Sequence, residues 1–240
     1  MTSDALQNWN QPEYAREYRD ESDYYIPHRA IIIHLVGSYA SAFMGSLPRP
    51  KLMDLGCGDG AVSLALHRAL PAGEIVAADG SADMIGAARK RLAGMTVEFR
   101  TVSFEGIIAG KISGLRFDGI FSALAIHHLP LDGKAALFQA LQPLLNPGGH
   151  FLNVDAVTTD VPEYTEWHFT LWREWIETNQ KALHLEQSYG HIPERARAKE
   201  ENHYDPLGAQ LAALREAGFS DVECHYRFGI FAAYGGRVKP

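Results

Sequence analysis

Residues 54–60 read D-L-G-C-G-D-G and lie between an apolar run typical of a buried strand and a pattern typical of a helix. Glycines in such a turn let the backbone approach a ligand closely, and the helix that follows offers unpaired N–H donors at its first turn. About 20 residues beyond the turn, Asp79 ends the next strand-like run, at the separation where a carboxylate can bind the hydroxyls of a ribose. Together the turn and Asp79 indicate a site for a nucleoside-containing cofactor.

Other interpretations of this turn exist. Some glycine turns only tighten the packing of a strand on a helix, and dinucleotide-binding folds use a similar one. An NAD-binding enzyme is disfavoured because its turn normally reads G-x-G-x-x-G, whereas this one reads G-C-G-D-G-A. Asp79 could instead cap the next helix, but Ser81 already occupies that position. We therefore favour the ribose-binding interpretation.

Two adjacent histidines, His127 and His128, follow a strand-like run at residues 117–122. Ligands of open α/β sheets bind beyond the carboxyl ends of the strands. An imidazole changes its charge near neutral pH, so it can act as a general base there. His127 is our candidate catalytic base and His128 a candidate substrate-pocket residue, although one of them could only fix the loop by hydrogen bonding.

Strand-like runs alternate with helical patterns through the middle of the chain, which is typical of βαβ units and a parallel sheet. The predicted strands are residues 52–55, 75–79, 97–102, 117–122 and 150–155. The predicted helices are residues 61–70, 82–93 and 132–145, the last ended by the N-P-G-G run at 146–149.

The carboxyl-terminal part of the chain has a different pattern. Asp205 and Pro206 predict a helix with Asp205 as its N-cap and the proline in its first turn. Two β-like runs follow at 222–226 and 230–234, and so short a connection permits only an antiparallel pair. We expect an α/β, Rossmann-like, doubly wound sheet of seven strands, mostly parallel, with an antiparallel hairpin at its carboxyl-terminal end.

Two segments lie outside this frame: residues 1–45, the cap segment, with a helix from Pro27, and residues 156–204, the lid segment. We expect both to belong to a single domain. In the lid segment, large side chains repeat at spacings of three and four and so share one helical face. These residues are Tyr164, Trp167, His168, Leu171, Trp172 and Trp175. This face either packs onto the domain or encloses an acceptor molecule. If it encloses an acceptor, we expect the substrate pocket to include Trp167, His168, Trp172 and Tyr189.

The glycine turn and the V-A-A-D-G-S-A-D-M run at 76–84 resemble the first two motifs of class I S-adenosylmethionine-dependent methyltransferases. The resemblance continues at residues 117–129, 145–149 and 214–219, so it covers most of the chain. It implies S-adenosyl-L-methionine as cofactor, with no metal. The cofactor residues that it implies are Arg29, Asp54, Gly56, Cys57, Gly58, Asp79, Gly80, Met84, Ser103, Phe104 and Ser122.

The adenine-binding position of this chain departs from the family pattern. Members of the family commonly place an aspartate after the third strand to bind adenine, and Ser103 stands there in this chain, with Glu105 as a substitute. In similar enzymes an N-terminal helix folds over the cofactor, so Tyr18 and Tyr25 become further catalytic candidates that could close the site.

Composition excludes several classes of partner. Lys plus Arg number 22 against 29 Asp plus Glu, a formal charge of −7, and no basic run occurs, so we expect no nucleic-acid partner. The polar amino terminus and the lack of long apolar stretches predict no membrane partner. Only two cysteines occur, Cys57 and Cys224, in no paired spacing, which favours a reduced, cytoplasmic location. Association into a homodimer is left open.

The function that the sequence favours is methyl transfer from S-adenosylmethionine to a small-molecule acceptor by direct in-line displacement. An alternative within the same fold is an enzyme that cyclises or otherwise modifies S-adenosylmethionine itself, and tRNA modification is less favoured because of the acidic charge. A non-enzymatic cofactor-binding protein would keep the glycine turn and Asp79 but would not need the aromatic lid segment.

Overall fold

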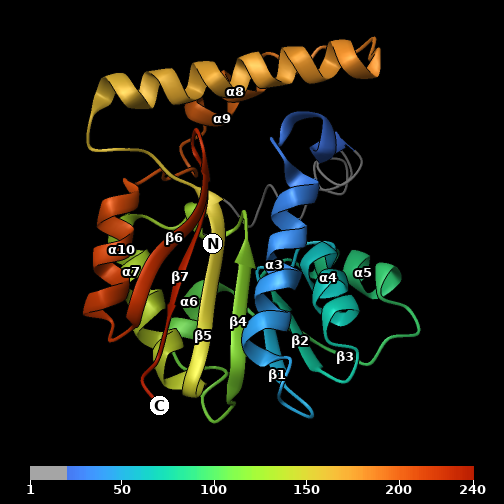
Figure 1. The fold of residues 1–240 in the computed structure, drawn as a ribbon, viewed down its shortest axis with the longest axis vertical. Helices are drawn as coiled ribbons and strands as arrows, with labels where there is room; N and C mark the ends of the chain where they lie inside the picture. Colours follow the sequence, from blue (N-terminus) through green and yellow to red (C-terminus); the bar gives the residue numbers. More distant parts are fainter. Residues whose placement is uncertain (1–20) are drawn as a thin grey trace.

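Seven strands form one mixed sheet in the computed structural model, which describes residues 21–240 (Figure 1). The strands are β1 (Lys51–Leu55), β2 (Glu74–Asp79), β3 (Val97–Thr101), β4 (Phe117–Ala123), β5 (Leu145–Ala156), β6 (Ser220–Phe228) and β7 (Phe231–Arg237). Their order is β3-β2-β1-β4-β5-β7-β6, in which the first five are parallel and β7 runs antiparallel to both β5 and β6. The predicted fold class is confirmed.

Helices cover both faces of the sheet. They are α3 (Arg29–Met44), α4 (Ala61–Ala69), α5 (Ala82–Arg91), α6 (Phe104–Ile108), α7 (Leu131–Leu141), α8 (Pro162–Leu183), α9 (Ile192–Ala198) and α10 (Leu207–Glu216). Helices α3, α4 and α5 lie on one face and α6, α7 and α10 on the other, while α8 and α9 lie beyond the carboxyl ends of the parallel strands (Figure 1). No helix in residues 21–240 combines the length and the apolar character that a bilayer span requires.

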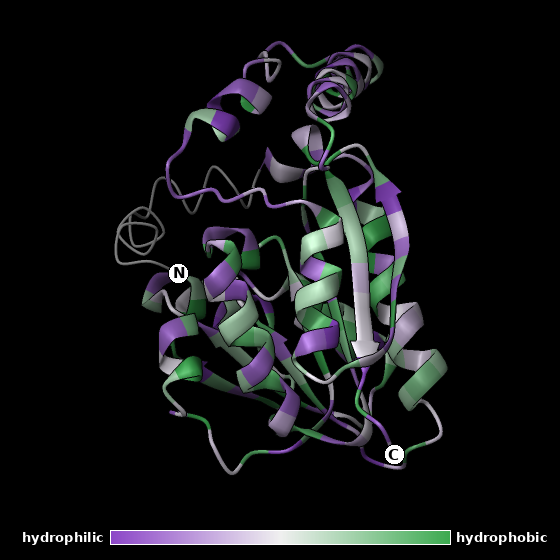
Figure 2. Ribbon diagram, turned by 90° about the vertical axis from the view of Figure 1, so that its left-hand side faces the viewer, coloured by the Kyte–Doolittle hydropathy of each residue, from purple (hydrophilic) through white to green (hydrophobic). Residues whose placement is uncertain are grey.

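The strands are apolar on both sides because helices bury both faces of the sheet. Along β1, Leu52 packs in the cluster beneath α3 and α4, and the next residue, Met53, packs in the cluster beneath α6 and α7. Figure 2 shows the hydrophobic colouring concentrated in the sheet and the helices packed on it. Ligands of open sheets of this kind bind beyond the carboxyl ends of the strands.

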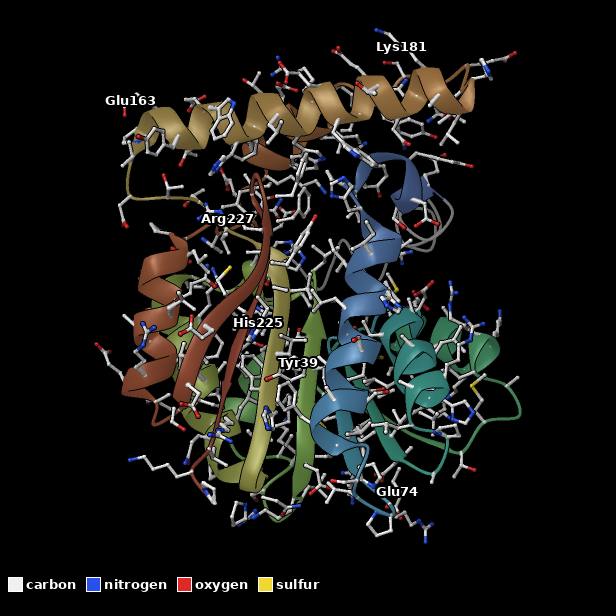
Figure 3. All side chains as sticks on the ribbon, viewed as in Figure 1. Tyr39, Glu74, Glu163, Lys181, His225 and Arg227 are labelled. Atoms are coloured by element: carbon white, nitrogen blue, oxygen red, sulfur yellow. The ribbon has the colours of Figure 1, made fainter. Side chains whose placement is uncertain are left out.

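The lid segment rests on the tip of the β6–β7 hairpin. The Trp172 ring of α8 meets the Phe231 ring of β7 edge-on, with centroids 5.1 Å apart. At the same tip Arg227 donates to the backbone oxygens of Gly229, at 3.2 Å, and Thr158, at 3.3 Å. Figure 3 places Arg227 below α8, whose two ends are marked by Glu163 and Lys181. These residues put an acidic and a basic side chain at the helix ends that favour them.

Two predicted boundaries are wrong around β5. The predicted helix 132–145 ends at Leu141, and a 3₁₀ turn over Gln142–Leu144 follows, since Pro143 cannot donate a backbone hydrogen bond. The N-P-G-G run is not a turn before the strand but lies inside β5, where the pairing with β4 shifts register and Gly148 has φ +76°. The residues that were expected to form a loop therefore form a β-bulge within the strand.

Other differences concern short elements. Helix α10 begins at Leu207, and Pro206 precedes it in an extended conformation. Asp205 does not cap it, because its carboxylate pairs with the buried Lys134 ammonium. Helices α6 and α9 were not predicted, since each has fewer than eight residues and shows little periodicity.

Candidate active site

A cleft of about 710 Å³, the cofactor cleft, lies where the carboxyl ends of β1, β2 and β4 meet the amino-terminal part of α3. Among the cofactor residues expected from the sequence, those that line it are Arg29, Gly56, Cys57, Gly58, Asp79 and Met84. Residues that are distant in the sequence thus converge on one cleft, as the motifs predicted.

Asp54 is fully buried beneath the glycine turn. Its Oδ2 accepts hydrogen bonds from the Ser63 backbone N–H at 2.8 Å and the Ser63 hydroxyl at 2.6 Å, while Oδ1 has no partner among the described residues. Burial raises the pKa of this carboxyl to about 7, against the lowering effect of the two hydrogen bonds from Ser63. A buried acceptor without a partner costs free energy, so this oxygen fits a cofactor that brings an ammonium group, but Asp54 is not among the residues that line the cofactor cleft.

The glycine turn leaves room for a ligand above its backbone. Gly58 has φ +52°, lines the cleft, and would place a Cβ atom in open space. At Gly56, by contrast, a Cβ would come within 2.5 Å of the Ala125 Cβ, so this glycine is required by packing. Cys57 between them is buried, and burial raises the pKa of its thiol well above the ordinary value, so it lines the cleft as an uncharged group.

Asp79 holds the turn and faces the cofactor cleft. Its Oδ2 accepts from the Gly58 N–H at 2.9 Å and its Oδ1 from the Ser81 N–H at 2.8 Å. Each carboxylate oxygen has two lone pairs, so both can accept a further hydrogen bond from a ribose hydroxyl. Ser81 caps α5, as predicted, because its hydroxyl accepts from the Met84 N–H at 3.3 Å.

The remaining predicted cofactor residues are divided between two places. Gly80, Ser103 and Phe104 line a smaller hollow of about 180 Å³ that adjoins the cleft at Gly56 and Asp79. The Ser103 hydroxyl already caps α6 by accepting from the Gly106 N–H at 3.2 Å. Ser122 is not brought to the cleft: it is fully buried, and its hydroxyl donates to the Leu55 carbonyl at 2.8 Å, joining β4 to β1.

A second cavity of about 680 Å³ lies between the sheet and the lid segment. It shares Ile26, Leu124 and His128 with the cofactor cleft, so the two spaces adjoin. Tyr25, Trp172 and Phe231 give it an aromatic wall. An aromatic space beside a cofactor cleft is suited to an acceptor molecule.

His127 lines the second cavity and contacts Asp155 at the end of β5. The imidazole Nδ1 lies 2.5 Å from the Asp155 Oδ1, and the His127 backbone N–H donates to Oδ2 at 2.9 Å. Because a carboxylate only accepts, Nδ1 carries the hydrogen and Nε2 is the ring atom that can take a proton from a ligand. The sequence analysis singled out His127 but not Asp155, which appeared only as the last residue of a predicted strand.

His128 lies at the junction of the two spaces and is buried. Burial, with the neighbouring His127 as a smaller cause, lowers the pKa of its imidazole well below the ordinary value, so the ring is neutral. Its Nδ1 contacts the Glu201 carbonyl at 3.2 Å, which fixes the loop after β4 to the lid segment. The sequence offered these two roles, pocket wall and loop anchor, as alternatives, and the structure places both on one residue.

The aromatic residues predicted for the pocket separate into inner and outer groups. Trp172 lines the second cavity, and its indole N–H donates to the Tyr25 carbonyl at 2.6 Å. Trp167 is 58% exposed, and neither it nor Tyr164 shares the buried face, which runs through His168, Trp172 and Ile176 at a spacing of four. The predicted buried face of α8 therefore wrongly included Tyr164 and Trp167.

Two further predicted pocket residues, His168 and Tyr189, do not line the second cavity. His168 is buried at the hairpin tip, with its Nδ1 3.5 Å from Arg227. Tyr189 is buried behind the pocket, its ring centroid 6.0 Å from that of Tyr25. Tyr18 lies outside the described residues.

Sequence reasoning missed several residues of the second cavity. Arg195, Lys199, Asn202 and Tyr204 line it from α9 and the chain that follows. A run of charged residues at 194–201 was their only signal, and such a run is more often a solvated surface. Residues 21–240 contain no cluster of three or more His, Cys, Asp or Glu side chains arranged to hold a metal ion.

Comparison with known proteins agrees with this geometry. A family profile described as a methyltransferase domain matches residues 52–149, which hold the glycine turn, Asp79 and the histidine pair. An uncharacterized methyltransferase of Mycobacterium tuberculosis is 31% identical over 121 residues, 50% of this chain and 57% of the relative's length. The match thus spans little more than half of that relative.

Two further proteins resemble the chain over more of its length. A carboxy-S-adenosyl-L-methionine synthase of Trichlorobacter lovleyi is 25% identical over 218 residues, 87% of this chain and 83% of that protein. The crystal structure of magnesium protoporphyrin IX methyltransferase from Synechocystis PCC 6803 with bound SAH superposes with a TM-score of 0.68 over the whole of both chains, at 15% identity, and shares the fold. Residues 52–149 therefore match a methyltransferase domain, and these likenesses support class I S-adenosylmethionine-dependent methyltransferases as the family and S-adenosylmethionine as the cofactor.

Proposed function

We propose that the protein transfers a methyl group from S-adenosylmethionine to a small-molecule acceptor held in the second cavity. The observation that carries this proposal is the shared wall of the two spaces, Ile26, Leu124 and His128, which puts an acceptor directly beside the cofactor. An aromatic space beside the cofactor would not be needed in a protein that only binds the cofactor. Proximity and exclusion of water supply much of the catalysis in such a reaction.

Different residues would bind different parts of the cofactor. Asp79 would accept from the ribose hydroxyls, and Met84 would pack against the adenine. The unpartnered Oδ1 of Asp54 is available to the ammonium group of the methionine part. Arg29, which lines the cleft and pairs with Asp23 at 2.9 Å, can hold the carboxylate of the same part.

When bound, S-adenosylmethionine supplies a methyl group on a positively charged sulfur, and that charge disappears as the methyl leaves. His127 Nε2 would hold the proton that the acceptor gives up, so that the acceptor atom has a free lone pair to offer to the methyl group that the cofactor would supply. Asp155 keeps the hydrogen of the His127 ring on Nδ1 and stabilises the imidazolium that forms. Trp172, held by its hydrogen bond to the Tyr25 carbonyl, would form part of the wall around the acceptor.

A second candidate function is modification of S-adenosylmethionine itself. The observation that favours it is the likeness to carboxy-S-adenosyl-L-methionine synthases, at 23–25% identity over 84–95% of the chain. In that case the second cavity would hold a donor of the new group instead of a methyl acceptor.

Mass spectrometry of every cofactor-derived product distinguishes the two functions. Purified protein is incubated with S-adenosylmethionine alone and then with a panel of small acceptors. Formation of S-adenosylhomocysteine together with a methylated acceptor supports methyl transfer. Methylthioadenosine or a heavier form of the cofactor, made without methylation of any acceptor, would show that the enzyme acts on the cofactor.

A further inference from the structure

A lysine ammonium is fully buried in α7. Lys134 is the fourth residue of this helix, and among residues 21–240 it is the only lysine or arginine that is buried. Burying a charge costs free energy, and a cation is disfavoured near the amino-terminal end of a helix. Apolar residues often replace a buried ion pair with no loss of stability. Stability alone therefore does not explain a lysine at this position.

The ammonium holds the segment that follows the lid helices, residues 201–205, here called the strap. Its Nζ donates to the His203 carbonyl at 2.6 Å and to the Asp205 carboxylate. The two partners are 69 and 71 positions away in the sequence. One side chain of α7 thus holds both a backbone atom and a side chain of the strap.

The strap in turn contacts the loop that carries the histidine pair. The His203 N–H donates to the His127 carbonyl at 2.7 Å, and the Glu201 carbonyl contacts the His128 ring at 3.2 Å. The His127 N–H donates to Asp155 at 2.9 Å. Both backbone groups of His127 are therefore held, one by the sheet and the other by the strap.

This loop depends on contacts from outside it. It consists of a single 3₁₀ turn over Ile126–His128, and Leu124 before the turn has φ +54°. Such a φ disfavours a residue with a side chain and persists only where the surroundings impose it. The strap also brings Tyr204 to the second cavity, with its ring centroid 5.7 Å from that of His127.

We propose that Lys134 is a positioning residue for the histidine pair: through His203 it fixes the backbone of His127 and with it the orientation of the imidazole. Its effect on methyl transfer rests on the proposed function, in which His127 is the base. Lys134 lines neither the cofactor cleft nor the second cavity, so it acts on the reaction only through the strap.

The variant Lys134→Met keeps the length of the side chain and removes the charge and both hydrogen bonds. We expect the His203 and His127 amides to exchange with solvent on the order of tenfold faster, the effect of one lost hydrogen bond to a charged group, and kcat to fall by a similar factor. The affinity for S-adenosylhomocysteine should not change. Nuclear magnetic resonance measures the exchange, turnover with the acceptor panel gives kcat, and calorimetry gives the affinity.

The matched control is Leu141→Ala. Leu141 is fully buried seven positions further along α7, and its side chain cannot hydrogen-bond to the strap. The variant should lose stability, because it leaves a cavity in the core, and should change neither the exchange of the two amides nor kcat.

The double variant Lys134→Met/Asp205→Leu separates positioning from stability. An apolar pair replaces the ion pair, so stability should recover, but the His203 carbonyl still lacks its bond from the ammonium. We expect the exchange to stay fast and kcat to stay low. Recovery of both together with stability would show that the pair only stabilises the fold and would overturn the proposal. This variant carries the test by itself if Lys134→Met does not fold.

The outcomes also separate this inference from the proposed function. Unchanged exchange at both amides, in either variant, overturns the positioning role whatever the activity. If acceptors are methylated and the lysine variants keep the kcat of the wild type, methyl transfer stands and the positioning role falls. If exchange rises as expected but mass spectrometry finds only a modified cofactor, Lys134 still positions His127 and methyl transfer falls.

Discussion

The Asp155 carboxylate contacts His127 at two points, accepting from the ring at 2.5 Å and from the backbone N–H at 2.9 Å. The carboxylate is 1% exposed and the His127 side chain 12%, so the pair is shielded from water but borders the second cavity. A backbone contact fixes the position of the residue, and a ring contact fixes the tautomer. This geometry supports the proposed role of His127 as a general base.

Asp155→Asn is expected to lower kcat on the order of 10²-fold with little change in cofactor affinity, because the amide cannot stabilise an imidazolium. His127→Gln should produce a similar loss. Steady-state kinetics and calorimetry with S-adenosylmethionine measure the two quantities. Tyr234→Phe is the matched control: its hydroxyl bonds to Asn153 and Gln210 in the same buried network but not to His127, so the variant should lose stability and keep its kcat. An unchanged kcat in Asp155→Asn would remove the base from the mechanism.

Asp79→Ala is expected to weaken S-adenosylmethionine binding by about 2 kcal/mol or more, since it removes acceptors from a buried polar site. Calorimetric titration measures the affinity. Asp83→Ala removes the same charge from an exposed position in the first turn of α5 and should leave the affinity unchanged. Equal affinities in Asp79→Ala and the wild type would show that the ribose lies elsewhere.

Cofactor binding is expected to strengthen as pH rises towards 7 and to release close to one proton below that pH. The pKa of Asp54 is raised to about 7 by burial, so the empty site is protonated below pH 7 and must ionise to bind an ammonium group. Calorimetry in buffers of different ionisation enthalpy counts the released proton. Asp54→Asn should abolish both the release and the pH dependence; a release that persists in this variant would assign it to another group.

The raised pKa of Asp54 also predicts that the free energy of unfolding falls as pH rises, whereas cofactor binding strengthens. Between the unfolded pKa, near 3.8, and about 7, the native state holds a proton on Asp54 that the unfolded state has lost. The contribution of this group to the free energy of unfolding therefore falls as pH rises through that window and is constant above it. Urea unfolding from pH 5 to 8 without cofactor, in the wild type and in Asp54→Asn, measures it: the wild type should lose stability relative to the variant.

Gly58→Ala and Gly94→Ala should separate backbone strain from ligand clearance. Both glycines have positive φ, +52° and +84°, and a Cβ at either meets no atom within 4 Å, so each variant should lose about 1 kcal/mol of stability. Only Gly58 lines the cofactor cleft. Calorimetry should therefore find weaker cofactor binding in Gly58→Ala alone, and equal affinities in the two variants would show that the cofactor does not approach Gly58.

The two tryptophans of α8 should respond differently to the same change. Trp172→Phe removes the hydrogen bond to the Tyr25 carbonyl and is expected to cost about 1 kcal/mol or more. Trp167 is 58% exposed, so Trp167→Phe should alter stability by less than about 0.5 kcal/mol. Urea unfolding measures both, and a larger loss for Trp167 would indicate that its exposed ring has a partner.

The sequence by itself determined the sheet and the cofactor cleft. The strand-like runs, the glycine turn, Asp79 and the Ser81 cap are local signals, because alternation, spacing and turn chemistry act over a few residues. Parallel strands place their carboxyl ends at one edge, so Asp54, Asp79 and the histidine pair had to converge once the strands were assigned.

Only the tertiary structure decided what surrounds the acceptor. The pairing of His127 with Asp155, which are 28 positions apart in the sequence, depends on β4 and β5 lying side by side. Arg195 and Lys199 reach the second cavity because the lid segment packs Trp172 against the backbone of Tyr25, 147 residues earlier in the chain. Such contacts arise from packing between distant segments, which periodicity and motif spacing do not encode. For the same reason, the buried face of α8 that the sequence predicted wrongly included Trp167.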